Sequence, residues 1–318
     1  MPLNDQILHV TIITSTEDIA SQTIRSKLLE LYPFKLQKDS GKWNKDAINS
    51  VSKYIHTNPD LSSIEFSLID TDISMIRLDE FLSPDEMFGD LIIYASRHQS
   101  KSEQPALLCH TPGNLNADNS AGGESFKIAK GSGLLSYYCY HHLVDLAHKE
   151  GNYDVPINHE VTHHGPTKFT QPSIFIELGS TEVGWKNETG GKIIAQAIIN
   201  VCCDLSQKHY REGKWQKDDI KIGIGFGGGH YMPSFSSCIQ NMIGFAHTVP
   251  KYKVLDLTLE MIQQILDRSL EKIDFWVIDW KGLKSAERLH VLSLLEKFDS
   301  IPYKKSKELR KTSKNLKI

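Results

Sequence analysis

Residues 7–31 read ILHVTIITSTEDIASQTIRSKLLEL, and this stretch decides the fold class. Its first eight residues are rich in β-branched side chains, which predicts a strand over 7–14. The polar residues at positions 14–16 offer helix caps, and a helical run follows from Asp18 to Leu31. A strand that leads directly into a helix is the building unit of α/β proteins.

The same alternation continues along most of the chain. We predict further strands at Ile64–Ile69, Leu91–Ser96, Ala106–His110, Val155–Val161, Ser173–Leu178, Ile220–Phe226 and Phe275–Trp280. We predict further helices at Asn44–His56, Leu134–Lys149, Gly190–Lys208, Thr258–Lys272 and Ser285–Phe298. This order predicts a layered α/β/α fold around a mostly parallel or mixed central sheet.

The length of 318 residues fits a single α/β unit over residues 1–303, built as one domain or as two packed lobes. Residues 304–318 are basic and poor in apolar side chains, which predicts a solvated, frayed tail. A weak electrostatic contact with nucleic acid is the alternative for this tail.

Charge and cysteine content narrow the function classes. The net charge is only -3, so any contact with RNA must rest on a local basic patch. The five cysteines are odd in number and show no CxxC spacing, which argues against a disulfide framework and against thiolate zinc knuckles. Without a signal peptide or an apolar run of membrane-spanning length, we expect a cytoplasmic protein with no membrane association.

The histidines are unevenly distributed. Eight of the fourteen lie between positions 98 and 164, where an even spread would place about three. Histidine is suited to proton transfer near neutral pH and to zinc ligation. These eight are His98, His110, His141, His142, His148, His159, His163 and His164.

Two polar segments follow predicted strands, and ligands of open α/β sheets bind beyond strand carboxyl ends. In Ser96-Arg97-His98, the guanidinium of Arg97 can fork onto a phosphate, although a surface salt bridge is equally consistent. In the second segment, His110 to Asn114, a Pro-Gly pair predicts a turn that brings backbone amides close to a ligand.

A third segment contains His163-His164-Gly165-Pro166. Adjacent histidines on a strand point to opposite faces, but a Gly-Pro turn lets both side chains converge. The alternative is a turn with one histidine packed and the other exposed. The helical face of His141, Asp145 and His148 has metal-ligand spacing too, but we interpret it as a hydrated surface.

Glu177 lies inside an otherwise apolar predicted strand, where a carboxylate is costly unless paired or bound to a metal. A structural ion pair, a metal ligand and a general base with a raised pKa all stay open. Residues 222–250 contain no Asp, Glu, Lys or Arg, yet include the run 227–229 of glycines, His230 and His247. This composition predicts a buried site wall, in which glycine lets a ligand approach the backbone.

Taken together, these segments resemble the D-aminoacyl-tRNA deacylases of the archaeal and plant type. The matching pieces, in the family's order, are ASRH (95–98), PALLCH (105–110), GN (113–114), THHGPT (162–167), PSIFIELGS (172–180), GGGHY (227–231), FAH (245–247), PKY (250–252) and VIDWKG (277–282). The resemblance implies an enzyme that frees a D-amino acid from mischarged tRNA, with zinc and a cytosolic setting. It also implies a fold akin to peptidyl-tRNA hydrolases and nucleoside phosphorylases.

The resemblance and the residues together give a site hypothesis. Zinc is held by some of His110, His163, His164, Glu177 and His230. The catalytic set is His98, His163, Glu177, His230 and His247, and the substrate-binding set is Arg97, Asn114, Gly228 and Gly229. The expected partner is the acceptor end of D-aminoacyl-tRNA, bound by a monomer with no obligate protein partner.

Two other functions stay open at this point. A non-catalytic tRNA- or nucleotide-binding protein on a phosphorylase-like fold would keep Arg97 and the glycines but would not need histidines around Glu177. A zinc-dependent peptidase or amidohydrolase would usually carry HExxH or a similar spacing, which the sequence lacks.

Overall fold

The expected first strand and helix are present. Strand β1 covers Leu8–Ser15 and helix α1 covers Ile19–Leu31, with Asp18 as the N-cap, whose side chain accepts a hydrogen bond from the backbone N–H of Ser21. The computed structural model describes residues 7–37, 51–56, 63–84, 89–100, 103–151, 153–211, 214–215 and 219–310.

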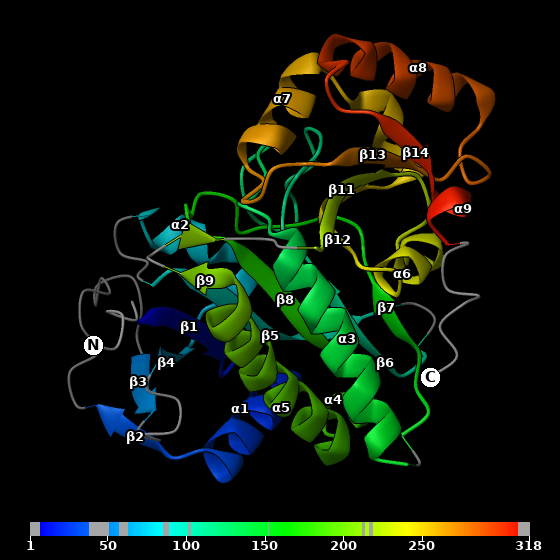
Figure 1. Ribbon diagram of the computed structural model, residues 1–318. Coiled ribbons are helices and arrows are strands. Elements are labelled where there is room, and N and C mark those ends of the chain that lie inside the picture. Colours follow the sequence, from blue (N-terminus) through cyan, green and yellow to red (C-terminus); the bar gives the residue numbers. More distant parts are fainter. Residues whose placement is uncertain are drawn as a thin grey trace, which may run out of the picture.

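The larger of two main sheets has the strand order β2-β3-β4-β1-β5-β8-β6-β7 (Figure 1). The strands besides β1 are β2 (Phe34–Gln37), β3 (Val51–His56), β4 (Ile64–Thr71), β5 (Leu91–Gln99), β6 (Ala106–His110), β7 (Ile157–His159) and β8 (Ser173–Ser180). Strands β4, β1, β5 and β8 are parallel, whereas β6 runs antiparallel to β8. The expected mixed sheet is therefore confirmed.

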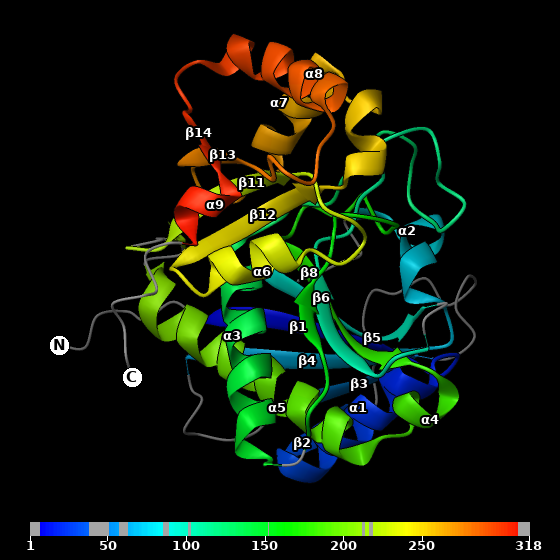
Figure 2. The same cartoon turned by 90° about the vertical axis from the view of Figure 1, so that its right-hand side faces the viewer.

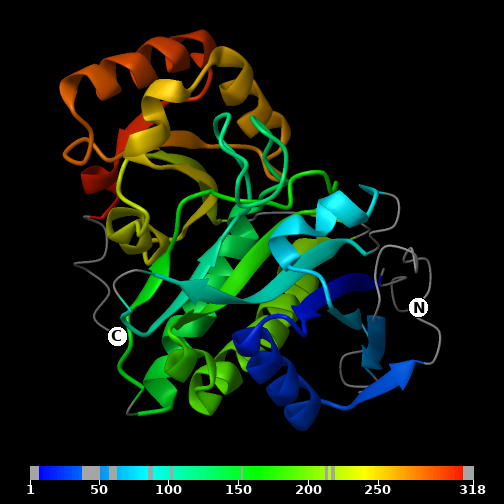
Figure 3. The ribbon, with the colours of Figure 1, turned by 180° about the vertical axis from the view of Figure 1, so that it is seen from behind.

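Helices cover one face of this large sheet (Figure 1). They are α1, α3 (Gly133–Lys149) and α5 (Glu188–Asp204), and the short α4 (Glu182–Trp185) follows β8. Helix α5 buries an apolar stripe that includes Ile194, Ile198 and Val201, because apolar residues recur at helical spacing. The opposite face, seen from behind in Figure 3, carries α2 (Leu78–Phe81), the 3-10 turn Met75–Arg77 and the loops that build the site.

The second, small sheet is entirely parallel and has the order β12-β11-β13-β14. Its strands are β11 (Lys221–Phe226), β12 (Ile243–Val249), β13 (Phe275–Ile278) and β14 (Tyr303–Lys305), connected through α6 (Pro233–Ile239), α7 (Leu259–Asp267) and α8 (Ser285–Leu295). Helices α7 and α8 lie on its outer side (Figure 2). We call each of these two sheets, together with its helices, a lobe.

The lobes meet where the first turn of α3 lies against β12. A Cβ atom added to Gly244 would lie 2.0 Å from the carbonyl oxygen of Gly133, so the two backbones touch at this point. Only glycine permits such a close approach. We call this contact, between α3 and β12, the lobe seam.

Several predicted elements differ from the structure. The helix expected over Asn44–His56 is wrong for Val51–His56, which forms strand β3. Strand β3 lies between β2 and β4 and pairs with both, and this pairing overrides the helical pattern. Residues 44–50 lie outside the described residues. Predicted helix Gly190–Lys208 ends at Asp204 and continues as a π turn, Leu205–His209. Helix Thr258–Lys272 is shorter, Leu259–Asp267, and strand β12 was not anticipated.

The basic tail begins later than the sequence suggested. Tyr303–Lys305 is β14 and Ser306–Leu309 is α9, which packs against α6 through a contact of Cys238 Sγ with the Ser306 carbonyl. Residues 311–318 lie outside the described residues. All five cysteines are free thiols, as expected, and no helix among the described residues is long and apolar enough to cross a membrane.

The remaining short elements are the β-hairpin of β9 (Tyr210–Arg211) and β10 (Lys214–Trp215) and the 3-10 turns Lys251–Asp256 and Glu296–Phe298. Of these, the turn 251–256 follows β12 and adjoins the site.

Candidate active site

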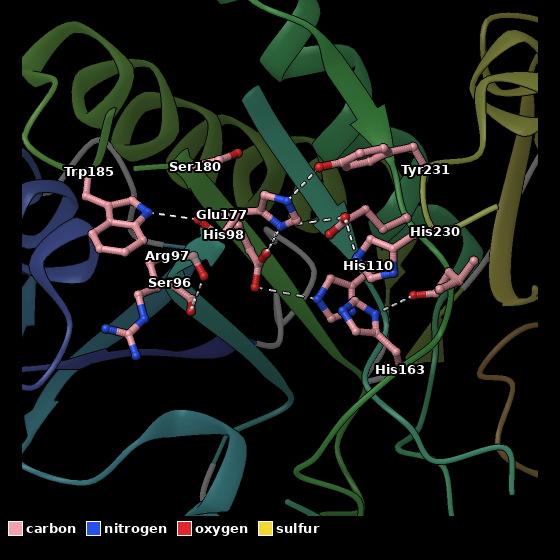
Figure 4. Close-up of polar contacts among 12 residues, drawn as sticks. Ser96, Arg97, His98, His110, His163, Glu177, Ser180, Trp185, His230 and Tyr231 are labelled. Atoms are coloured by element: carbon pink, nitrogen blue, oxygen red, sulfur yellow. Dashed lines mark hydrogen bonds and ion pairs between the residues drawn. The ribbon is translucent and has the colours of Figure 1, made fainter. Parts of the chain in front are cut away.

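Glu177 is the centre of the site, on the face of the large sheet opposite helices α3 and α5. Strand register places it between Ser96 of β5 and Leu108 of β6. His98 and His110 lie two residues further along those neighbouring strands, so all three side chains share one face. His98 Nδ1 lies 3.2 Å from Glu177 Oε2, and His110 Nε2 lies 3.6 Å from Glu177 Oε1 (Figure 4).

The antiparallel direction of β6 creates this arrangement. His98 is near the carboxyl end of β5 and His110 is at the carboxyl end of β6, and these ends point in opposite directions. The two rings therefore meet Glu177 from opposite sides, on the sheet face rather than at one rim. Gly179 makes room for the first ring, because a Cβ there would lie 2.8 Å from the Cβ of His98.

The second part of the site is the segment after β7. His163 and His164 lie against His110, with ring centroids 4.0 Å and 4.7 Å from it. Each of the three rings has its Nδ1 near a backbone carbonyl: Val161 for His163 at 2.8 Å, Gly165 for His164 at 2.7 Å, and Thr111 for His110 at 3.3 Å. A carbonyl only accepts, so in His163 and His164 Nδ1 carries the proton and Nε2 is left with a lone pair.

The third part comes from the turn after β11. His230 Nε2 lies 3.1 Å from Oε1 of Glu160, a fully buried carboxylate, and Tyr231 Oη lies 2.8 Å from His98 Nε2. The backbone of this turn pairs with the chain after β7, since the Val161 N–H donates to the His230 carbonyl. The small sheet thus presents two side chains to the large one (Figure 4).

Charges in the site are strongly coupled. Burial alone would raise the pKa of Glu177, but His110 and His98 outweigh it and hold that pKa well below its usual value. Burial alone would lower the pKa of His98, but Glu177 and Glu160 outweigh it and raise that pKa. His98 and Glu177 therefore each favour the charged form of the other.

His163 and His164 behave in the opposite way. Burial, together with the neighbouring histidines, lowers the pKa of His163 well below its usual value and lowers the pKa of His164 to about 3. Both rings are therefore neutral at physiological pH, the form in which imidazole binds metals.

Several polar atoms in the centre lack partners. His110 Nε2 and both carboxylate oxygens of Glu160 are buried and make no well-aligned hydrogen bond with the described residues, although His230 Nε2 lies 3.1 Å from Oε1 of Glu160. One ligand atom each of His110, His163 and His164 lie within 4.8 Å of one another, and the same holds for His110, Glu160 and Glu177. Two buried carboxylates beside the neutral rings of His163 and His164 favour a bound cation.

Two cavities open on this cluster. The larger, about 690 Å³, lies over the ends of β1 and β5 and is lined in part by Asp72, Arg97, His98 and Glu177. The smaller, about 310 Å³, is lined in part by the chain 113–121 and by Pro250, Tyr252 and Lys253. His163, His164 and His230 line both cavities, and we call these three residues the histidine wall.

Of the substrate-binding residues expected from the sequence, some line a cavity and others do not. Arg97 lines the larger cavity, with its guanidinium 5.5 Å from the ring centre of Trp185. Asn114 lines the smaller cavity, but its amide donates to the carbonyls of Gly122 and Glu124 and so holds the loop. Gly228 and Gly229 line neither cavity; Gly228, with a positive φ of 82°, shapes the turn that delivers His230.

His247 is the one expected catalytic residue that the structure does not bring to the cluster. It lies at the lobe seam, where its Nε2 is 3.3 Å from the Arg268 carbonyl and its Nδ1 is 3.5 Å from Thr162 Oγ1. A Cβ on Gly131 would meet its ring at 2.8 Å. The ring fills the seam and supports the backbone beneath His163.

Sequence reasoning missed two residues of the site. Glu160 lies in the same segment as His163, but a single glutamate beside histidines gave no sign of being fully buried. Tyr231 was part of the family resemblance, yet its contact with His98 depends on the docking of the two lobes. The helix histidines, by contrast, are outside the site: His141 Nε2 contacts the Ile239 carbonyl and His142 pairs with Asp204.

Buried His247 predicts loss of stability in mild acid. Burial lowers its pKa to about 4. Between pH 4 and the ordinary pKa of 6.5, this histidine therefore binds a proton in the unfolded chain but not in the folded chain. Its contribution to stability is complete above pH 6.5 and is lost as the pH falls toward 4, by about 1.4 kcal/mol per pH unit. Denaturant unfolding of wild type and His247→Gln across this range measures it. Identical pH dependence of the two proteins would contradict the prediction.

Comparison with known proteins places the chain in a family. The sequence profile of the D-aminoacyl-tRNA deacylases matches residues 86–301, more than half of the chain. D-aminoacyl-tRNA deacylase of Methanosarcina barkeri is 34% identical over 295 residues, which cover 91% of this chain and 87% of the relative. The enzyme of Thermococcus onnurineus is 34% identical over 292 residues, covering 90% and 96%.

One solved structure shares the fold of this chain. The crystal structure of a conserved protein of unknown function superposes with a TM-score of 0.78 at 26% identity, covering 96% of this chain and 98% of that one. The Arabidopsis thaliana 5'-methylthioadenosine nucleosidase reaches a TM-score of only 0.36, too low to bear on the expected likeness to phosphorylases. The profile and the archaeal relatives show that the chain belongs to the D-aminoacyl-tRNA deacylase family.

Proposed function

We propose that the cluster around Glu177 is the centre at which this chain hydrolyses the ester bond between a D-amino acid and tRNA, with zinc as cofactor. The observation that supports it best is the convergence of imidazoles and two buried carboxylates on a wall shared by two cavities. An aminoacyl ester is already activated. The site must hold the carbonyl, accept a proton from water and stabilise the developing oxyanion.

The residues present fit a zinc ion. His110, His163 and His164 each bind a backbone carbonyl through Nδ1, which is the support that metal-ligating histidines commonly have. These three would hold the ion, and the buried carboxylates of Glu177 and Glu160 would add negative charge. Zinc bound there would supply a Lewis acid that polarises the ester carbonyl.

His230 is suited to act as the general base. Its Nε2 faces the buried Glu160 carboxylate at 3.1 Å, which leaves Nδ1 with a lone pair. Its side chain is 40% exposed and lines both cavities, so it reaches a water beside the ester. Glu160 orients the ring and stabilises the imidazolium formed when Nδ1 takes the proton, and the ring returns that proton to the ribose oxygen as the ester C–O bond breaks.

His98 supplies a fixed positive charge. Glu177 and Tyr231 occupy its two ring nitrogens, so the ring is held rigidly in its protonated form beside the larger cavity. A preorganised charge stabilises an oxyanion more effectively than mobile water does. In this proposal Tyr231 is a positioning residue, because its hydroxyl acts through His98.

Arg97 is placed to bind the acceptor end of tRNA through phosphate, the contact that a guanidinium makes best. A cytoplasmic location and a monomeric state stay predictions from the sequence.

Removal of zinc tests the proposal. We expect purified protein to contain zinc, to lose deacylation of D-aminoacyl-tRNA on chelation, and to regain it when zinc is restored. Hydrolysis is measured on tRNA charged with the D- and L-forms of one amino acid, and the L-charged tRNA should remain intact. Full activity of metal-free protein would argue against zinc, and binding of tRNA without hydrolysis would favour the non-catalytic alternative.

A further inference from the structure

The histidine wall separates two cavities that differ in size and in the side chains that line them. From this difference we infer that the smaller cavity receives the side chain of the amino acid and the larger one receives the terminal nucleotide of the tRNA. The inference rests on the proposed function, because it divides the substrate of that reaction at its ester carbon.

The smaller cavity suits an amino-acid side chain in size and lining. Its volume of about 310 Å³ is near the lower end of small-molecule pockets, roughly 300–1,000 Å³. Leu115, Pro250 and Tyr252 give it apolar surface, while Asn114 and Asn116 add neutral polar groups. Such a lining accepts apolar and aromatic side chains alike.

A phosphate is poorly suited to the smaller cavity. The ammonium group of Lys253 already contacts Asn116 Oδ1 at 2.8 Å and Asp118 Oδ2 at 4.0 Å. The Asp118 carboxylate, also in the lining, offsets the charge of Lys253. A phosphate placed here would have to compete with these contacts for the ammonium group.

The larger cavity offers what a nucleotide needs. Arg97 lines this cavity together with the carboxylates of Asp18 and Asp72, and its guanidinium is 5.5 Å from the ring centre of Trp185 (Figure 4). A guanidinium binds phosphate through paired N–H groups. Oδ1 of Asp72 is buried in the lining without a hydrogen-bond partner among the described residues, so it can accept from a ribose hydroxyl or a base amino group.

This division fixes where the reaction occurs. The ester joins the two halves of the substrate, so its carbonyl carbon must lie at the histidine wall, next to His230 and the proposed metal ligands. Preference among amino acids is then set by residues of the smaller cavity, above all Ala121 and Tyr252, and these are exposed enough to be changed without disturbing the core.

The test uses the intact protein and tRNA charged with D-alanine or D-tyrosine. Ala121→Phe, which fills the smaller cavity, should lower kcat/KM for D-tyrosyl-tRNA by about tenfold or more and leave D-alanyl-tRNA nearly unchanged. Tyr252→Ala, which widens it, should not penalise the larger substrate. The matched control is Ser74→Phe, at an exposed position in the larger cavity, which should lower kcat/KM for both substrates equally.

The outcomes separate the two proposals. Ala121→Phe affecting both substrates equally, or neither, would overturn the assignment while wild-type activity leaves the proposed function intact. A size-dependent effect of Ser74→Phe would reverse the assignment and so overturn it. Wild type that hydrolyses neither substrate would overturn the proposed function and the assignment with it. Thermal unfolding of each variant verifies that the fold is retained.

Discussion

Replacing Glu177 by Gln should lower deacylation by about 100-fold to 10,000-fold, the range that general acid–base and preorganised electrostatic groups contribute. Gln keeps the size of the side chain but removes the charge that keeps His98 protonated and faces His110. The neutral amide also cannot balance a cation in the cluster. The measurement is kcat/KM on D-aminoacyl-tRNA, with circular dichroism to verify that the fold is retained.

The matched control for Glu177→Gln is Asp204→Asn. Asp204 pairs with His142 at 3.0 Å between helices α5 and α3, outside the site and partly exposed. An ion pair of this kind contributes little to stability, so this variant should keep wild-type turnover. If Glu177→Gln retained turnover near that of wild type, the central role given to this carboxylate would be refuted.

His163→Ala and His230→Ala should both lower turnover by about 100-fold or more, but for different reasons. His163 is a proposed zinc ligand, so its removal should also reduce the zinc content of the purified protein. His230 is the proposed base on the exposed side of the wall, so its variant should lose turnover and keep zinc. Metal analysis beside the deacylation assay distinguishes the two roles.

The control for this pair is His141→Ala, which removes a partly buried histidine of α3 whose Nε2 contacts the Ile239 carbonyl, outside the site. It should retain both zinc and turnover. If the His163→Ala protein kept its zinc, the proposed set of zinc ligands would be wrong. If the His230→Ala protein lost its zinc, His230 would be a zinc ligand.

Local sequence patterns predicted most of the elements that carry the site. Strands β5, β6 and β8 were expected because each is a short, apolar run that ends in polar residues, and these runs fix where His98, His110 and Glu177 lie. The histidine pair at 163–164 was expected to converge because a Gly-Pro turn follows it. The structure brings these side chains together.

The features that the sequence did not predict share a physical cause, which is long-range packing. Strand β12 and the division into two sheets depend on which strands pair, and a strand pattern alone does not state its neighbours. His247 lies in a charge-free segment like His230, but its ring faces the lobe seam instead of the cluster. Glycines 228 and 229 shape a turn rather than line a cavity. Glu160 is buried because the second lobe docks above it.

The lobe seam makes catalysis depend on the contact between the two sheets. The carboxylate anchor of the site belongs to one sheet, while His230 and Tyr231 are carried by the other, and the glycine contact between Gly133 and Gly244 sets their separation. If one sheet tilted away from the other, His230 would move away from the ester even though every strand stayed paired. Catalytic activity therefore depends on the contact between the two lobes, and it should be lost before either lobe unfolds.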